Sequence, residues 1–175
     1  MSPYVSLIIW RWVESGDIEV LLALRSAFQY DDPSRVQPQD FCGGWQIFPS
    51  GKLGGDEGSP LHAAWSKLRD DGGVMAMIGL KALVGSNPAR LRQVDQNCFA
   101  IEIKESDNFD GDSDFLNLVN LSPNYTLVAW KPLGEILNFN DLALYRNGVP
   151  KGVKAIFKDQ LDLIKKLADQ VRRTG

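Results

Sequence analysis

Residues 48–73, which read FPSGKLGGDEGSPLHAAWSKLRDDGG, bring together the charged side chains best suited to chemistry. Glu57 lies in a glycine-rich segment, and Asp70 and Asp71 follow an apolar stripe at helical spacing. On a helix, Lys67 would share a face with both aspartates, because residues three and four positions apart are neighbours. Carboxylates hold Mg²⁺ or Mn²⁺ against the phosphate groups of a substrate. The stretch therefore raises the hypothesis of a metal-dependent phosphohydrolase site.

Other kinds of catalytic centre find little support. A Ser-His-Asp or Cys-His centre needs a histidine base, and the chain has one histidine, His62, which we assign to the surface. The segment after Gly51 lacks the Gly-Lys-Ser/Thr ending of a P-loop and the spacing of a dinucleotide fingerprint. Cys42 and Cys98 form no Cys-x-x-Cys pair and no secretory signal is present, so we expect reduced cysteines and a cytoplasmic protein.

Composition limits the fold and the partners. A length of 175 residues with 44% hydrophobic side chains predicts a single domain over residues 1–175 with a sizeable core. The net charge is −3, and 19 Lys and Arg spread along the chain form no basic stripe for a nucleic-acid polymer. No apolar run approaches the ~20 residues that cross a membrane. We therefore expect neither a nucleic-acid polymer nor a membrane as a partner, and the sequence leaves a single nucleotide and a homodimer open.

The elements before and within the charged stretch can be predicted from local signals. Residues 5–10 and 19–24 are rich in β-branched and apolar side chains and flank a Ser-Gly-Asp turn, which predicts a hairpin. Residues 45–48 predict a third strand. A helix is predicted between Pro60 and the pair Gly72-Gly73, since Ser59 is a good cap, proline suits the first helical position and glycines favour a stop.

The rest of the chain adds further strands and a terminal helix. We predict strands over residues 74–84, 98–103 and 125–130, with a loop at 85–92. Apolar residues at helical spacing from 153 to 171 predict a helix of about five turns that packs on a sheet. Strands before and after a central helix, with a helix at the end, predict an α/β fold in which helices cover a mixed sheet.

Residues 51–74 follow a particular spacing of glycines, acids and apolar residues. The residues of this pattern are Gly51, Glu57, Leu68, Asp70, Asp71, Gly73 and Val74. The pattern resembles the signature box of the Nudix hydrolase family. The box is degenerate, because one extra residue follows Glu57 and Ser66-Lys67 stand in place of the family's Arg-Glu. The resemblance implies a Nudix-like α/β/α sandwich with a mixed β-sheet between helices.

The same resemblance implies a pyrophosphohydrolase that splits nucleoside diphosphate-linked compounds with Mg²⁺ or Mn²⁺. Glu57, Asp70 and Asp71 would bind the metal and form the catalytic centre. Lys67 stands where a family glutamate binds metal, so the cofactor would be absent if its ammonium replaces that ligand. The alternative function is a catalytically inactive Nudix-fold module that binds a nucleotide or has a regulatory role. Lys67, Asp70 and Asp71 also fit a solvated helix face with a surface ion pair.

Further candidates lie around the box. Trp45 or Phe48 would hold the base of a substrate, although aromatic residues in a short strand equally fit the core. Glu102 lies at a strand end where some family members keep a catalytic general base, and strand alternation equally places it on the solvent face. The other candidates for substrate binding are Arg25, Gly51 and Lys52. Lys52 would meet a phosphate as a point charge, or would be an ordinary exposed loop lysine.

Overall fold

The computed structural model describes residues 4–55, 58–109, 111 and 114–174. Its strands are β1 (Tyr4–Trp12), β2 (Ile18–Arg25), β3 (Phe28–Gln29), β4 (Gln37–Pro38), β5 (Trp45–Ile47), β6 (Ser50–Lys52), β7 (Leu91–Asp95), β8 (Cys98–Glu102), β9 (Tyr125–Pro132), β10 (Asn140–Asp141) and β11 (Ala155–Ile156). Its helices are α1 (Pro60–Gly72), α2 (Val74–Ser86), α3 (Leu133–Ile136) and α4 (Lys158–Thr174), with short 3-10 helices η1 (Pro88–Arg90), η2 (Phe115–Leu118) and η3 (Leu142–Leu144).

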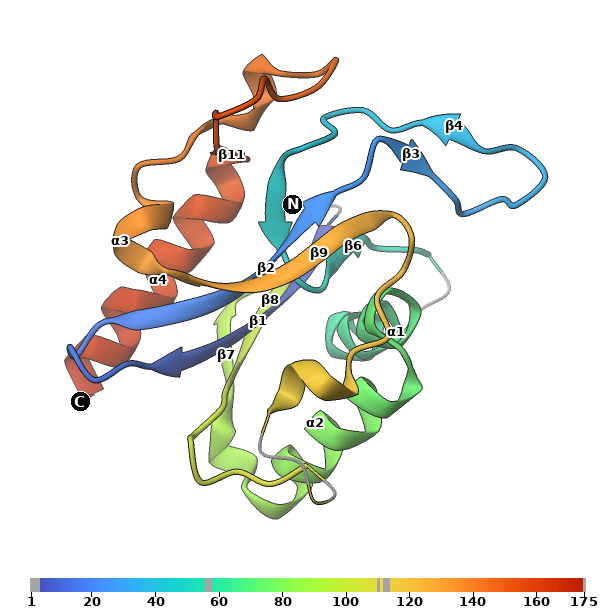
Figure 1. Ribbon diagram of the computed structural model, residues 1–175. Coiled ribbons are helices and arrows are strands. Elements are labelled where there is room, and N and C mark those ends of the chain that lie inside the picture. The colour runs from blue at the N-terminus through green and yellow to red at the C-terminus, as the bar shows by residue number, and fades with distance from the viewer. Residues whose placement is uncertain (1–3, 56–57, 110, 112–113, 175) are drawn as a thin grey trace.

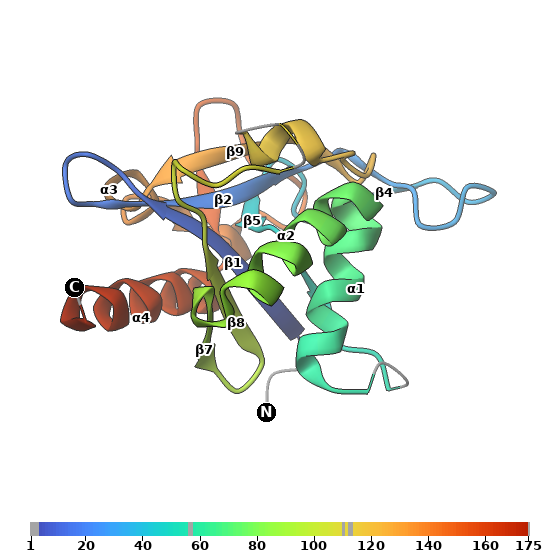
Figure 2. The same ribbon diagram turned by 90° about the horizontal axis from the view of Figure 1, so that it is seen from below.

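A mixed β-sheet is the centre of the fold. Nine of the described strands join it in the order β10-β11-β5-β2-β1-β8-β7, with β6 also paired to β1 and β9 to β2. β1 runs antiparallel to β2 and parallel to β8. Figure 1 and the view from below in Figure 2 show α1 and α2 on one face of the sheet and α4 on the other. The predicted α/β sandwich with a mixed sheet is confirmed.

Burial on both faces explains why the predicted hairpin is so apolar. β1 and β2 pair as predicted, and Gly16 in their turn has a φ of 82°, a conformation that favours glycine. Along β1, Leu7 and Ile9 belong to the hydrophobic cluster under α1 and α2, whereas Ile8 and Trp10 belong to the cluster under α4. A strand buried on both faces carries apolar residues throughout instead of alternating.

α1 begins and ends where the sequence predicts. Ser59 Oγ accepts a hydrogen bond of 3.2 Å from the backbone N–H of His62, and Pro60 is the first helical residue. Gly73, directly after the helix, has a φ of 92°. Leu68 is fully buried between the helix and the sheet. This packing fixes the rotation of α1 and therefore the direction of its polar side chains.

Residues 74–84 form most of α2, so the prediction of a strand there was wrong. α2 buries Ala76 and Leu80, which lie four residues apart, and leaves Val74 and Ile78 52% and 51% exposed. A continuous apolar run does not distinguish a buried strand from a helix by periodicity. The Ala, Met and Leu content of this run favours the helix, and only one face of it finds apolar neighbours.

Two other boundaries differ from the prediction. The segment predicted as a loop at 85–92 contains the end of α2, all of η1 and the start of β7, which pairs antiparallel with β8. α4 begins at Lys158 and not near residue 153, because Ala155 and Ile156 form a strand beside β5. Both of these strand residues are buried. Their apolar character therefore continued the helical spacing past the true start of the helix.

The long connection after β2 forms an arm, residues 26–40. Its strands β3 and β4 pair with each other, and Figures 1 and 2 show them extending beyond the rest of the fold. Asn124, just before β9, anchors the arm: its side-chain oxygen accepts from the Tyr30 backbone (2.7 Å) and its amide donates to Asp31 (2.6 Å). The arm is thus held beside the N-terminal end of β9.

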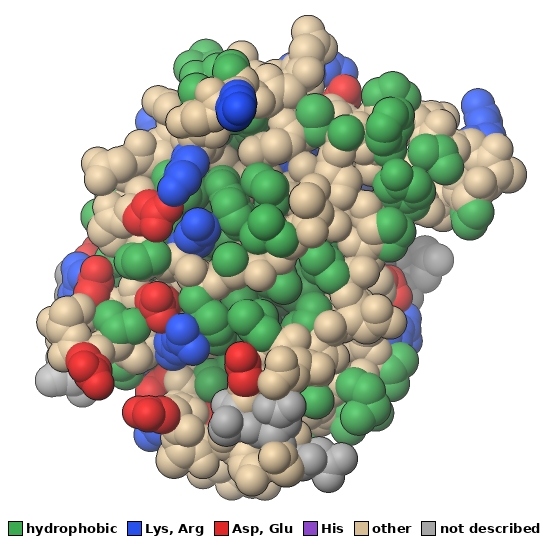
Figure 3. All heavy atoms as spheres, in the orientation of Figure 1, with side chains coloured by type: hydrophobic (Ala, Val, Ile, Leu, Met, Phe, Trp, Pro, Cys, Tyr) green, Lys and Arg blue, Asp and Glu red, His purple; other side chains and the backbone are tan. Residues whose placement is uncertain are grey.

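The surface carries both signs of charge. On the face shown in Figure 3, Lys and Arg side chains lie among Asp and Glu side chains. This distribution agrees with the scattered charges of the sequence. Within the described part of the chain, none of the helices combines the length and the apolar character that a membrane span requires.

Candidate functional site

A cavity of about 980 Å³ lies between the arm, β6, α1 and the start of α4. Residues from the sequence prediction line it, namely Arg25, Gly51, Lys52 and Asp71, and Lys67 lines it as well. These residues come from β2, β6 and α1, which are adjacent only in the folded protein. The volume lies at the upper end of the range for small-molecule sites.

Lys67 and Asp71 lie one helical turn apart on α1, and both line the cavity. The Lys67 side chain crosses the backbone of β6, since a Cβ atom at Gly51 would lie 2.7 Å from Lys67 Cε and 3.1 Å from Nζ. Asp70 instead forms an ion pair of 3.4 Å with Arg69 and does not line the cavity. Because glycine has no side chain, Gly51 leaves room for the Lys67 ammonium group at the edge of the cavity.

Asp71 is the partly buried acid of the site. Burial raises its pKa from 3.8 to about 6, although the Lys67 ammonium and a hydrogen bond with Tyr125 oppose the rise. Tyr125 Oη donates to Asp71 Oδ2 over 3.3 Å. Burial and the nearby carboxylate raise the pKa of Tyr125 above its ordinary value, so the phenol keeps its proton. At neutral pH the site therefore holds a carboxylate, a neutral phenol and an ammonium.

A chain of hydrogen bonds runs along the cavity from Asp71 to Arg25. Beyond the Tyr125–Asp71 bond, Gln46 Nε2 donates to Tyr125 Oη over 2.9 Å, and Arg25 Nη1 donates to Gln46 Oε1 over 2.8 Å. Gln46 is 5% exposed, so these partners fix its amide. Arg25 Nη2 also donates to the backbone carbonyl of Asp40 over 2.8 Å. These hydrogen bonds link α1, β9, β5 and β2. We call the four side chains Asp71, Tyr125, Gln46 and Arg25 the polar wall of the cavity.

The described residues do not fit a resident divalent cation. Of the three predicted ligands, Asp71 lines the cavity, Asp70 does not, and Glu57 lies outside the described residues. Within residues 4–55, 58–109, 111 and 114–174, no group of three or more His, Cys, Asp or Glu side chains is arranged to hold a metal. Lys67 places a positive charge beside Asp71, and like charges repel, so its ammonium opposes a cation there.

The two aromatic residues predicted to hold a base lie in the core. Phe48 is fully buried under α1, with its ring 6.1 Å from the ring of Tyr125. Trp45 is 7% exposed, packs in the cluster under α4, and has Lys131 Nζ 4.6 Å from its ring centre. Neither residue is among those that line the cavity. Their positions correspond to the alternative that the sequence left open for them.

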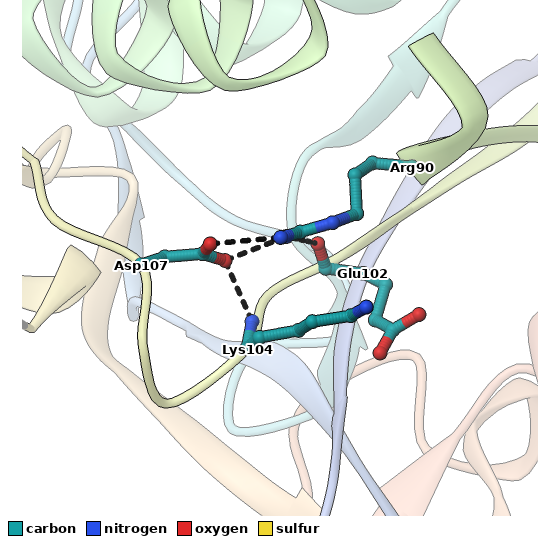
Figure 4. Close-up of polar contacts among 4 residues, drawn as sticks. All are labelled: Arg90, Glu102, Lys104 and Asp107. Atoms are coloured by element: carbon teal, nitrogen blue, oxygen red, sulfur yellow. Dashed lines mark hydrogen bonds and ion pairs between the residues drawn. The ribbon is translucent and has the colours of Figure 1, made fainter. Parts of the chain in front are cut away.

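Glu102 lies at the end of β8 away from the cavity. It borders a second hollow, of about 860 Å³, together with Trp12 and Glu105. Arg90 donates to the backbone carbonyl of Glu102 over 3.2 Å and makes a two-point ion pair with Asp107 at 2.6 and 2.9 Å. In Figure 4 the Glu102 carboxylate points away from this pair. Glu102 is therefore not brought together with Lys67 and Asp71.

Several cavity residues escaped the sequence prediction. Phe41 follows the arm and Phe157 precedes α4, and their rings meet edge to face with centres 4.9 Å apart. Their contact depends on how α4 packs beside β5, which no local spacing reveals. Gln46 and Tyr125 were missed because their strands, β5 and β9, come together only by pairing with β2. The one available signal was Gln46 itself, a polar residue within the apolar run WQIF.

The chain resembles known structures, whereas the two sequence comparisons gave no match. No family sequence model matches it, and neither does any curated protein sequence. A mutT/nudix family protein from Listeria innocua superposes with a TM-score of 0.54 at 15% identity, over 99% of this chain and 98% of that one. The fold is that of the Nudix superfamily. The expected Nudix-like sandwich is confirmed.

Two further structures support the Nudix fold. A NUDIX hydrolase structure from Listeria monocytogenes has a TM-score of 0.52 at 12% identity and covers 99% of this chain and 97% of its own. A C. elegans Ap4A hydrolase complex has a TM-score of 0.50 at 13% identity, with 97% of both chains covered. Such identities establish the architecture, and the chemistry must be argued from the residues of this Nudix-fold chain.

Proposed function

We propose that this Nudix-fold protein binds a small nucleotide-linked compound in the cavity and holds its phosphate groups through Lys67. The observation that carries the proposal is the position of Lys67, which crosses Gly51 and lines the cavity beside Asp71. In the pattern that the chain resembles, this position belongs to a metal-binding glutamate. An ammonium at the same place contacts a phosphate directly and needs no bridging cation.

The other charges of the cavity support a ligand with more than phosphate. Lys52 and Arg25 add positive charge to the lining. Asp40 and Asp159 also line the cavity, and carboxylates accept hydrogen bonds. Sugar hydroxyls and base amino groups are neutral donors that can meet these carboxylates, whereas inorganic phosphate is an anion that the carboxylates repel. A nucleotide-linked compound therefore suits the mixed lining better than inorganic phosphate.

Titration calorimetry in the presence of EDTA tests the proposal. The panel comprises ADP-ribose, nucleotide sugars, dinucleoside polyphosphates and nucleoside triphosphates, and at least one should bind without metal. Lys67→Met should weaken that binding by about tenfold or more, because a hydrogen bond to a charged group contributes ~1.5–3 kcal/mol. Lys165→Met is the matched control, since Lys165 is an exposed lysine of α4 that does not line the cavity.

Two results would count against the proposal. One is the absence of binding by any member of the panel without metal. The other is equal weakening by Lys67→Met and Lys165→Met, which would indicate a general effect of charge. Circular dichroism of both variants shows whether each remains folded.

A second candidate function is metal-dependent hydrolysis of the same class of compound, with Mg²⁺ or Mn²⁺. It is favoured by the fold, because the known structures that resemble this chain include an Ap4A hydrolase. Phosphate release from the panel with Mg²⁺ and Mn²⁺ separates the two candidates. Turnover of ~1–10³ s⁻¹, the usual enzyme range, would establish a hydrolase. Ligand binding with negligible turnover would support the inactive module.

Three broader predictions accompany the proposal. We expect residues 1–175 to behave as one domain, to reside in the cytoplasm, and to interact with small molecules instead of nucleic-acid polymers. The sequence left a homodimer open, and the oligomeric state is a matter for experiment. Analytical ultracentrifugation with and without the ligand measures that assembly directly.

A further inference from the structure

We propose that Phe41 and Phe157 form the wall on which the nucleobase of the bound compound stacks, so that the cavity selects nucleotides over sugar phosphates. This inference rests on the proposed function, because it assigns a second part of the same ligand. Phe41 and Phe157 take the role that the sequence suggested for Trp45 or Phe48. Both Trp45 and Phe48 are buried in the core.

The two rings meet the geometric needs of a stacking site. Both line the cavity, and both are partly buried, so each ring combines fixed packing with an exposed portion. Their centres lie 4.9 Å apart at an interplanar angle of 73°. An edge-to-face pair of this kind has rings of fixed orientation, and a third ring can join it. Stacking on such a platform tolerates different bases, because every base has a π-face.

The backbone of Phe41 gives an independent reason to expect a role for its ring. Its φ is 57°, in the left-handed region, where no other described non-glycine residue lies. The loop holds this conformation: the Phe41 N–H donates to the Arg146 carbonyl over 2.8 Å, and its own carbonyl accepts from Gly44 over 3.2 Å. Glycine would adopt this conformation without strain. A phenylalanine at this position indicates that the contribution of its ring offsets the free-energy cost of the left-handed backbone conformation.

The aromatic wall and the ammonium lie at different parts of one cavity. The hydrogen-bond chain of the site ends at Arg25, which binds the carbonyl of Asp40, the neighbour of Phe41. Its other end is Asp71, beside Lys67. A nucleotide has the same layout, with a ring at one end and phosphate groups at the other. The cavity therefore presents the two contacts in the order that a nucleotide needs.

The test compares two kinds of probe that differ by the base. The four common nucleoside monophosphates and ribose 5-phosphate are titrated into the full chain by calorimetry. The natural protein should bind at least one monophosphate more tightly than ribose 5-phosphate. Phe41→Leu should reduce that preference by about tenfold, since stacking of one base contributes a factor of this order. The same change should leave the affinity for ribose 5-phosphate as it is.

Three further variants keep the result interpretable. Phe157→Leu should reduce the preference like Phe41→Leu, and provides the answer if Phe41→Leu fails to fold. Phe28→Leu removes an exposed ring of the arm that does not line the cavity, and should change nothing. Lys67→Met should weaken nucleotide and sugar phosphate alike, because both carry the phosphate.

The outcomes separate the two proposals. Equal affinity for ribose 5-phosphate and all four nucleotides overturns the stacking wall and leaves phosphate binding at Lys67 intact. The same conclusion follows if both phenylalanine variants keep the full preference. If no probe and no member of the larger panel binds the natural protein, the proposed function fails and the stacking wall with it.

Discussion

Asp71→Asn should stabilise the protein at neutral and alkaline pH, because folding buries a carboxylate that prefers water. The pKa of Asp71 is about 6 in the folded protein, against an ordinary value of 3.8. Between these two values the folded state binds more protons than the unfolded state. The free energy of unfolding therefore falls as the pH rises through this window, and Asp71 contributes no further change above it.

The size of the effect follows from the same two pKa values. One pKa unit corresponds to about 1.4 kcal/mol, so the full difference amounts to about 3 kcal/mol. Asp71 is only partly buried, and solvent screening lowers the expected gain to about 1–2 kcal/mol. Asparagine has nearly the same shape, and its side-chain oxygen still accepts a hydrogen bond from Tyr125. The substitution therefore removes the charge and little else.

Urea unfolding of both forms at about pH 4 and about pH 8 measures the gain. We expect a clear gain at the higher pH and almost none at the lower pH, where the natural carboxyl group is largely protonated. Asp70→Asn is the matched control: the Asp70 side chain is 58% exposed, so the change should stay within about 0.5 kcal/mol at both values. A loss of stability in Asp71→Asn at pH 8, or a gain independent of pH, would refute the reasoning.

Three further substitutions test other parts of the structure. Arg90→Ala leaves the nearly buried Asp107 carboxylate without its partner, and urea unfolding should show a loss of about 3–5 kcal/mol. Gly44→Ala would place a Cβ 2.4 Å from Leu142 Cδ2, so thermal melts should show a loss of about 1–3 kcal/mol, and an unchanged melting temperature would contradict the packing. Lys67→Glu should strengthen Mn²⁺ binding in calorimetry and lower metal-free stability by about 0.2–0.5 kcal/mol per like-charged pair; equal Mn²⁺ affinity in both forms would show that Lys67 does not exclude the metal.

The sequence alone determined those elements whose signals are local. The hairpin of β1 and β2 depends on two apolar runs and on the turn around Gly16, all within about 20 residues of chain. The bounds of α1 depend on Ser59, Pro60 and Gly73, each of which acts on backbone groups within one helical turn. The mixed sandwich then follows from the order of strands and helices.

Where a segment is almost entirely apolar, the sequence could not determine its structure. Residues 74–84 have apolar side chains on all sides, and which side is buried depends on what α1 and η2 place against Ala76 and Leu80. The start of α4 was uncertain for the same reason, since buried strand residues precede it. In both segments the secondary structure depends on packing partners that are distant in sequence.

The candidate site was decided by tertiary structure. Spacing placed Lys67 and Asp71 on one helix face, but packing turned that face toward the cavity and left Asp70 outside it. The polar wall joins Arg25 to Tyr125 across 100 positions of chain, and the aromatic wall joins Phe41, after the arm, to Phe157, just before α4. Contacts of this kind arise because the sheet brings strand ends together. The spacing of residues along the sequence does not show which strand ends will meet.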